Sequence, residues 1–156
     1  MVATVTMTGR VGTNPQFART TSDVPYARFR LAHTPRLRRG GEWVDGQTLW
    51  CTVRCYGNLA KGVQSLRSGD PAVVVGQWRH EEWTDENGVV RSTQVLLADS
   101  VGPDLRWCAA HLYSQERDER VPDRDSVADE DQVEEDEEGG VPPEDSVDTT
   151  DELIRS

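Results

Sequence analysis

Aromatic residues recur beside arginines in a chain that otherwise consists of short apolar–polar segments and turns. The recurring aromatic residues are Trp43, Trp50, Tyr56 and Trp83. An aromatic ring offers a flat surface on which an unpaired base can stack, and a neighbouring guanidinium group can neutralise the phosphate that follows. If these side chains share one face of a sheet, that face is predicted to bind single-stranded nucleic acid.

The net charge of the whole chain argues against binding to nucleic acid, but it averages two segments of opposite charge. The net charge of −11 would repel a polyphosphate. However, residues 1–115 hold 13 Lys and Arg against 10 Asp and Glu, a net charge of +3, and residues 116–156 hold 4 against 18, a net charge of −14. We therefore expect one folded domain over residues 1–115 and a disordered acidic tail over residues 116–156.

Alternation of apolar and polar residues predicts the strands that would present the aromatic residues. Residues 3–11, 27–31 and 48–56 alternate in this way, with Arg28, Arg30, Trp50, Arg54 and Tyr56 on the sides opposite the apolar residues. Residues 72–75 are predicted to be a fully buried strand, and residues 90–98 return after a tight turn over 85–88. The second segment starts after a polar stretch through Asp23.

Two further segments connect these strands. Residues 35–47 are predicted to be an arginine-rich connection that could close over a ligand. A helix is expected after the third strand, with Asn58 as its cap, apolar residues at helical spacing, and Gly69 at its end.

The element order is strand, strand, strand, helix, strand, strand. This order predicts an all-β, five-stranded Greek-key barrel, the oligonucleotide/oligosaccharide-binding (OB) fold. An SH3-like barrel would not need a helix at that place.

Several classes of protein are not favoured. The sequence lacks a nucleophile elbow, a phosphate loop and paired His or Cys ligands, so we expect no enzyme activity, no metal and no other cofactor. No run approaches the ~20 apolar residues of a membrane span, and the first residues lack signal-peptide features, so we expect a cytoplasmic, nucleoid-associated protein.

The residues now described resemble a known family, the bacterial single-stranded DNA-binding proteins, over roughly residues 2–106. The resemblance rests on an ordered series of segments: residues 5–12, 14–15, 29–32, 50–60, 76–77, 83–85 and 88. It implies base stacking by Trp50, Tyr56 and Trp83 and a basic position at Arg79. It also implies a homotetramer that wraps single strands during replication, recombination and repair.

The chain departs from the family pattern at three places. Many members carry a further Trp where this chain has Leu37, and Trp43 is the nearest replacement. Two positions that are often basic are Glu81 and Glu82, which should weaken phosphate contact locally. The tail ends at residues 151–156 without the Pro-Phe tip that partner enzymes recognise, which suggests a specialised paralogue and leaves the tail's partners open.

Two hypotheses about function remain. The first is sequence-nonspecific binding of single-stranded DNA, and the second is a protein-interaction module on the same barrel with weak or no DNA binding. Trp78 and Trp107 are interpreted as packing or interface residues. The predicted DNA-binding residues are Trp50, Tyr56, Trp83, Arg54, Arg79, Arg28, Arg30, Trp43, Arg38 and Arg39.

The three cysteines allow one further hypothesis. Cys51 and Cys55 would lie about 13 Å apart on one strand, which exceeds the ~7 Å limit for a bridge within the chain. In a symmetric oligomer Cys51 could instead meet its own mate in a neighbouring subunit. The alternative is that Cys51 is a buried free thiol.

Overall fold

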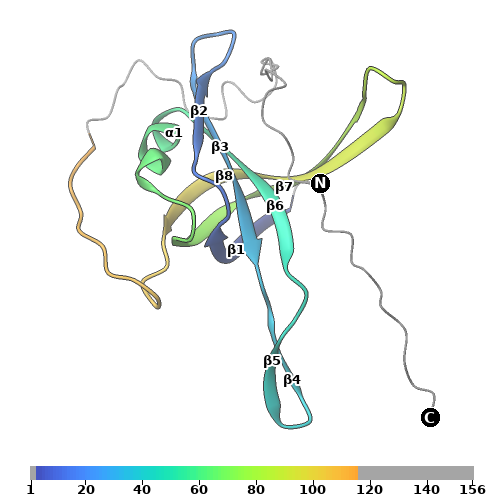
Figure 1. Cartoon of the computed structure of the whole chain (residues 1–156). Coiled ribbons are helices and arrows are strands. Elements are labelled where there is room, and N and C mark those ends of the chain that lie inside the picture. Colours follow the sequence, from blue (N-terminus) through green and yellow to red (C-terminus); the bar gives the residue numbers. More distant parts are fainter. Residues whose placement is uncertain (1–2, 116–156) are drawn as a thin grey trace.

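The computed structural model describes residues 3–115, and the predicted acidic tail over residues 116–156 lies outside the described residues. Five long strands curve into a closed ring, with one short helix beside it (Figure 1). The ring order is β1, β7, β8, β6, β3, and β1 closes it by pairing with β3. The predicted five-stranded Greek-key barrel is therefore confirmed. Its long strands are β1 (Thr4–Val11), β3 (Pro25–His33), β6 (Leu49–Tyr56), β7 (Pro71–Thr84) and β8 (Val90–Pro103).

The barrel closes where β1 leaves β7 and reaches β3. Arg10 lies opposite Ala32 and Val11 opposite Leu31, and both pairings are antiparallel. A Cβ atom at Gly9 would lie only 2.2 Å from the carbonyl oxygen of Ala32. A glycine is needed here because the two backbones approach too closely for any side chain.

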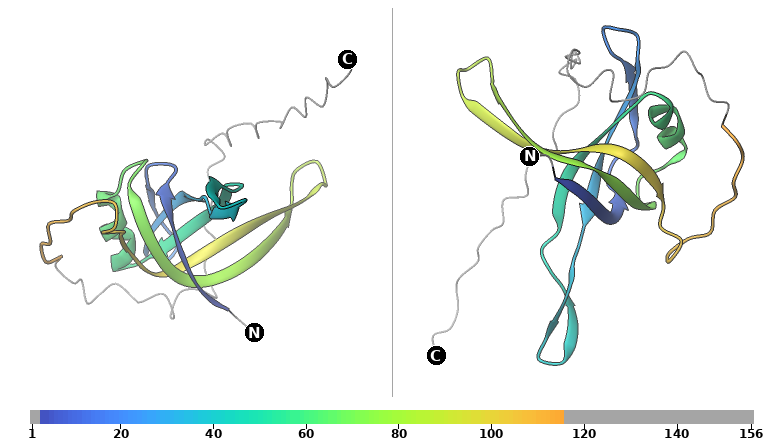
Figure 2. Two further views of the ribbon diagram at one scale, coloured as in Figure 1. Left: turned by 90° about the horizontal axis from the view of Figure 1, so that it is seen from below. Right: turned by 180° about the vertical axis from the view of Figure 1, so that it is seen from behind.

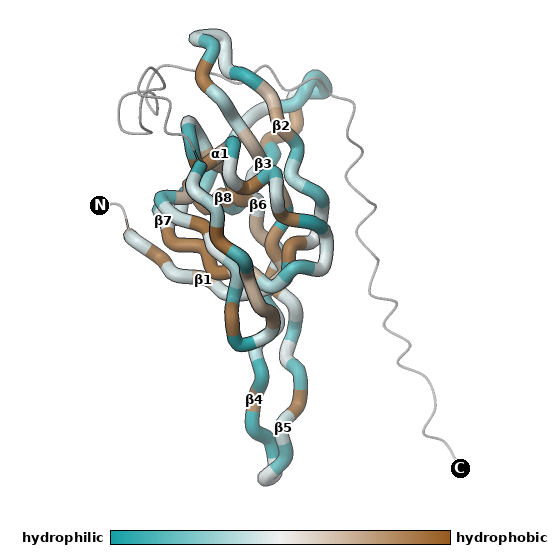
Figure 3. Tube along the Cα trace, turned by 90° about the vertical axis from the view of Figure 1, so that its left-hand side faces the viewer, coloured by the Kyte–Doolittle hydropathy of each residue, from teal (hydrophilic) through white to brown (hydrophobic). Residues whose placement is uncertain are grey.

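The core lies inside the ring and follows the alternation of the sequence. Phe29, Leu31, Val53 and Val74 are at most 2% exposed. Figure 3 shows hydrophobic segments concentrated in the barrel, whereas hydrophilic and hydrophobic positions alternate along the hairpin that projects from it. Because the inward positions of β3 and β6 are apolar, their alternate positions must face outward. Trp78 packs against the core from β7, as predicted.

The helix is shorter than expected, and its cap was wrongly predicted. Helix α1 covers Asn58–Gly62, followed by a 3₁₀ turn over Val63–Ser65, so it does not run to Gly69. Gly57, with φ of 65°, is the N-cap residue, and no side chain caps the helix. The chain leaves the helix early because the loop that follows bonds to β1: Gly69 N donates to Val11 O at 2.7 Å.

Three short strands were missed. The predicted connection over residues 35–47 contains an antiparallel hairpin of β4 (Arg36–Arg39) and β5 (Glu42–Asp45), which projects from the barrel (Figure 1). Gly40 and Gly41, both with positive φ, make its turn. The polar stretch before the second long strand contains β2 (Gln16–Arg19), which pairs with β3.

Strands β7 and β8 form one long hairpin whose tip extends well beyond the barrel (Figure 2). Residues 72–75 and Trp83 therefore belong to a single strand, not to two segments. The prediction that residues 72–75 are fully buried holds for Ala72 and Val74 but is wrong for Val73 and Val75, which are half-buried. A bulge between Val75 and Gly76 shifts the register as the hairpin leaves the barrel.

Candidate nucleic-acid interface

The outward side chains of β3 and β6 form a continuous surface. The antiparallel register places Arg28 opposite Arg54 and Ala32 opposite Trp50. Side chains that lie directly opposite each other in a ladder share one face of the sheet. The sequence prediction that these residues face away from the core is therefore confirmed.

Strand β7 adds its odd-numbered side chains to the same surface. Arg54 of β6 and Glu81 of β7 are joined by an ion pair of 2.9 Å. Arg79 and Trp83 lie two residues to either side of Glu81 and share its face of the strand. We call this surface the aromatic face, which consists of Trp50, Tyr56, Trp83, Arg28, Arg30, Arg54, Arg79 and Glu81.

Trp50 is held in place by two contacts and still offers much of its ring to solvent. The indole is 52% exposed, and the guanidinium carbon of Arg30 lies 5.6 Å from its ring centroid. The ring edge rests against Gly12, where a Cβ atom would come within 2.4 Å of Trp50 Cζ3. The backbone N–H of Gly12 donates to the carbonyl oxygen of Arg30 at 2.6 Å. Gly12 is thus part of the site, although only the family resemblance drew attention to it in the sequence.

Tyr56 is more enclosed than Trp50. Its ring centroid lies 5.2 Å from that of Tyr26, with the two planes tilted by 53°. Tyr26 lies directly opposite on β3 and is only 2% exposed. Tyr56 therefore presents part of its ring outward and leans with the rest on a buried neighbour.

Trp83 lies near the tip of the β7–β8 hairpin and is 50% exposed. Arg91 of β8 is directly opposite, and its Nε donates to Asp85 at 2.9 Å. The backbone N–H of Val89 and the guanidinium of Arg91 together hold the pKa of Asp85 below its usual value. The turn is therefore well bonded, which fixes the position from which Trp83 projects.

The arginines of the aromatic face differ in how they are engaged. Arg54 is paired with Glu81, and Arg28 Nε donates to Gln16 Oε1 at 3.0 Å. The guanidinium group of Arg30 lies over the ring of Trp50. Arg79, half-buried on β7, lies two residues from Glu81.

The remaining predicted residues lie on a separate two-stranded sheet. Trp43 is 60% exposed on β5 and lies opposite Arg38, with Arg39 opposite Glu42 at the end of the hairpin. The structure therefore brings together seven of the ten predicted DNA-binding residues on the aromatic face and leaves Trp43, Arg38 and Arg39 on the projecting hairpin.

Two apolar residues of β8 form a floor beneath the arginines, and the sequence analysis missed them. Val95 lies between Thr52 and Arg79, and Leu97 lies opposite Arg54, in the register of the sheet. Val95 is 1% exposed and Leu97 is 5% exposed, although both belong to the outward side. Long arginine stems cover apolar surface well while their charged heads stay in water.

The cysteines are all free. Cys51 is 2% exposed within the core, and its Sγ donates to Met7 Sδ at 3.6 Å. Burial raises the pKa of Cys51 to about 11 and that of Cys55 to about 12. This geometry favours the free thiol, and the bridge between subunits stays a prediction.

The described residues hold no helix that could span a membrane. Between residues 3 and 115 no three His, Cys, Asp or Glu side chains gather in a way that could hold a metal ion.

A closed five-stranded barrel that carries half-exposed aromatic residues and arginines on one face is typical of OB-fold proteins of the nucleic-acid-binding class. The comparisons agree with this class. The sequence model of the Single-strand binding protein family matches residues 2–104. The chain belongs to this family, as its sequence indicated.

Curated relatives carry the same description. The chain is 30% identical over 117 residues to the single-stranded DNA-binding protein of Mycolicibacterium smegmatis, covering 73% of this chain and 71% of the relative. It is 34% identical over 111 residues to single-stranded DNA-binding protein 2 of Streptomyces coelicolor, covering 69% of this chain and 56% of the relative.

Solved structures give the same result. A small single-stranded DNA-binding protein from Streptomyces coelicolor superposes with a TM-score of 0.62 at 33% identity, over 69% of this chain and 99% of that chain. The second single-stranded DNA-binding protein of Mycobacterium smegmatis superposes with a TM-score of 0.56 at 36% identity, over 73% of this chain and 100% of that chain.

Proposed function

We propose that the protein binds single-stranded DNA without sequence preference, through base stacking on the aromatic face. The observation that carries this proposal is the pair of half-exposed indoles, Trp50 and Trp83, on one arginine-lined face of a family member. Stacking is tolerant of sequence because every base has a flat face. The protein would act where single strands are exposed, in replication, recombination or repair in the cytoplasm.

The roles of the residues follow from their contacts. Trp50, Tyr56 and Trp83 would stack bases, and Arg30 and Arg79 would neutralise phosphates beside them. Trp43, Arg38 and Arg39 would extend the path of the strand along the projecting hairpin. Arg28 and Arg54 would contribute less, because Gln16 and Glu81 already engage them.

Titration with oligo-dT and with duplex of equal length tests the proposal. Binding should quench the intrinsic tryptophan fluorescence strongly with oligo-dT and weakly with duplex, and should weaken as salt rises because counterions are released. Absence of quenching by oligo-dT at low salt would reject DNA binding and favour the second function, a protein-interaction module built on the same barrel.

We also propose that the protein assembles as a homotetramer. Leu105, Trp107, Leu112 and Tyr113 are all more than 60% exposed in the single chain. Large apolar side chains gathered in one segment call for cover by a partner surface. Light scattering at micromolar concentration should give a tetramer mass, and a monomer mass would contradict the assembly.

The acidic segment over residues 116–156 is proposed to be a disordered tail that restrains DNA binding. Its net charge of −14 would compete with DNA for the arginines of the barrel, at an effective concentration set by the tether.

A further inference from the structure

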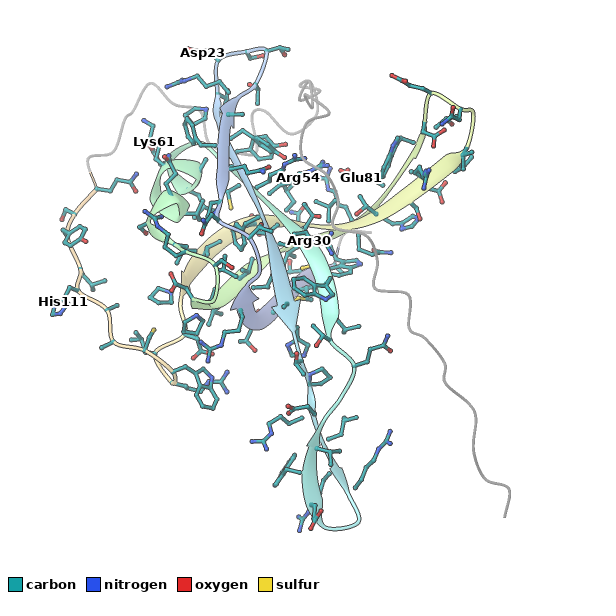
Figure 4. All side chains as sticks on the ribbon, viewed as in Figure 1. Asp23, Arg30, Arg54, Lys61, Glu81 and His111 are labelled. Carbon is teal, nitrogen blue, oxygen red and sulfur yellow. The ribbon has the colours of Figure 1, made fainter. Side chains whose placement is uncertain are left out.

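An acidic residue sits in the middle of a surface that should attract phosphates. Arg54 Nη1 lies 2.9 Å from both carboxylate oxygens of Glu81, which bridges β6 and β7 (Figure 4). The Arg54 side chain is 21% exposed and that of Glu81 is 38% exposed. The pair is therefore partly removed from water, where its mutual attraction is stronger than at an open surface.

The pair lies between the stacking rings. Trp50 and Tyr56 share β6 with Arg54, and Trp83 shares β7 with Glu81. A strand that stacks on the rings of both β6 and β7 has to cross this pair.

We propose that Glu81 is an internal competitor for phosphate. It occupies the guanidinium of Arg54 in the free protein and so withholds that guanidinium from a phosphate. Stacking then holds the strand at the centre of the aromatic face, and phosphate neutralisation depends mainly on Arg30, Arg79 and the β4–β5 hairpin. This inference rests on the proposed binding of single-stranded DNA.

The test compares Glu81→Gln with Glu82→Gln. Both substitutions raise the net charge by one, but Glu82 lies on the other side of β7, where its Oε1 contacts His80 Nε2 at 3.1 Å. The affinity for oligo-dT is measured by tryptophan quenching over a range of NaCl concentrations. Thermal melting of each variant checks that the barrel remains folded.

Release of Arg54 should add one phosphate contact. Glu81→Gln is expected to bind about tenfold more tightly at low salt, the effect of one charge-assisted hydrogen bond. The slope of log K against log salt should steepen by about 0.7, the value for one neutralised phosphate on a single strand. Glu82→Gln should leave the slope unchanged.

A third variant identifies the released group. If Arg54→Gln is added to Glu81→Gln, the gain in affinity and the steeper slope should both disappear. A gain that persists in this double variant, an equal effect of Glu81→Gln and Glu82→Gln, or weaker binding by Glu81→Gln would each overturn the competitor role. Failure of the parent chain to bind oligo-dT would instead overturn the proposed function, and the competitor role with it.

Discussion

Replacement of Gly12 by alanine is predicted to weaken DNA binding without unfolding the barrel. The alanine Cβ would lie 2.4 Å from Trp50 Cζ3, whereas carbon atoms in contact settle about 3.5–4.0 Å apart. The indole must therefore move by about 1 Å or more. Because the ring is 52% exposed, it has room to swing toward solvent. The backbone carbonyl oxygen of Arg30, 3.3 Å from the same Cβ atom, needs to move only slightly.

This movement should lower the affinity for DNA more than it lowers the free energy of unfolding. A displaced ring loses its contact with the Arg30 guanidinium, which lies 5.6 Å from the ring centroid. A cation–π contact of this kind contributes about 0.5–1 kcal/mol, so the free energy of unfolding should fall by no more than about 1 kcal/mol. Stacking of one base contributes about 1–3 kcal/mol, and losing about half of it at Trp50 would weaken binding by about 2- to 13-fold.

Fluorescence titration with oligo-dT measures the affinity, and urea denaturation measures the free energy of unfolding. Gly102→Ala is the matched control, because a Cβ atom there meets no atom within 4 Å, and both quantities should equal those of the parent. In a Trp50→Ala background, Gly12→Ala should cause no further loss of affinity. An equal loss in both backgrounds, or parent-like binding by Gly12→Ala, would refute the idea that Gly12 positions the indole.

Three further outcomes are expected. Trp83→Ala should weaken oligo-dT binding by about 5- to 150-fold through the loss of one stacking ring. Trp107→Ala, at a residue 64% exposed in the single chain but outside the aromatic face, should bind like the parent in the same titration as long as light scattering gives it the mass of the parent. With a thiol reagent at pH 8, Cys108 should react in the native protein and Cys51 only after unfolding. Since burial raises the pKa of Cys51 from 9.0 to about 11, its contribution to stability is fully present below pH 9 and is lost as the pH rises through about 11, which urea denaturation at several pH values can check. Truncation after Gln115 should raise the affinity for single strands at low salt, with a gain that shrinks as salt screens the tail, and weaker binding by the truncated chain would contradict the restraining role.

The sequence predicted the elements in which burial alternates along the strand. In β3 and β6, Phe29 and Val53 must reach the core, so the polar side chains at alternate positions leave a period of two in the sequence. The same rule placed Trp50 and Arg54 outward. It was misleading at Leu49, the first residue of β6, which alternates with the apolar set but is 54% exposed.

Elements without a buried side left no such pattern. Strands β2, β4 and β5 are exposed at every residue, so neither face of these strands had to be apolar. Only the pair Gly40-Gly41, with φ of 60° and 88°, signalled the hairpin turn. The end of α1 was decided by hydrogen bonds from the next loop to β1, such as that from Gly69 to Val11, which lie 58 positions apart and outside any local window.

Residues 95–98 lack an alternating pattern for the opposite reason, since they are buried and not exposed. All four positions are buried, so strand β8 has no polar face where it crosses the site, and alternation could not assign Val95 and Leu97 to the outward side. Only the register with β6 and β7 reveals that these residues lie beneath the arginines. The apolar residues Val95 and Leu97 of β8 thus belong to a polar site because β6 and β7 place arginines beside them.

The net charge of the barrel segment is likewise a sum that hides how its arginines are used. Ion pairs between an arginine and a carboxylate within residues 3–115 include Arg19 with Asp23, Arg36 with Asp45, Arg54 with Glu81, Arg91 with Asp85, and Arg106 with Asp104. An arginine in such a pair still counts toward the net charge, but its guanidinium is already engaged by a carboxylate and is less available to a phosphate. A barrel with a net charge of +3 and several arginines already paired attracts a polyanion only modestly. Affinity for single strands must then come mainly from the rings of Trp50, Tyr56 and Trp83, so alanine substitution at these rings should cost more affinity than substitution of any single arginine on the aromatic face.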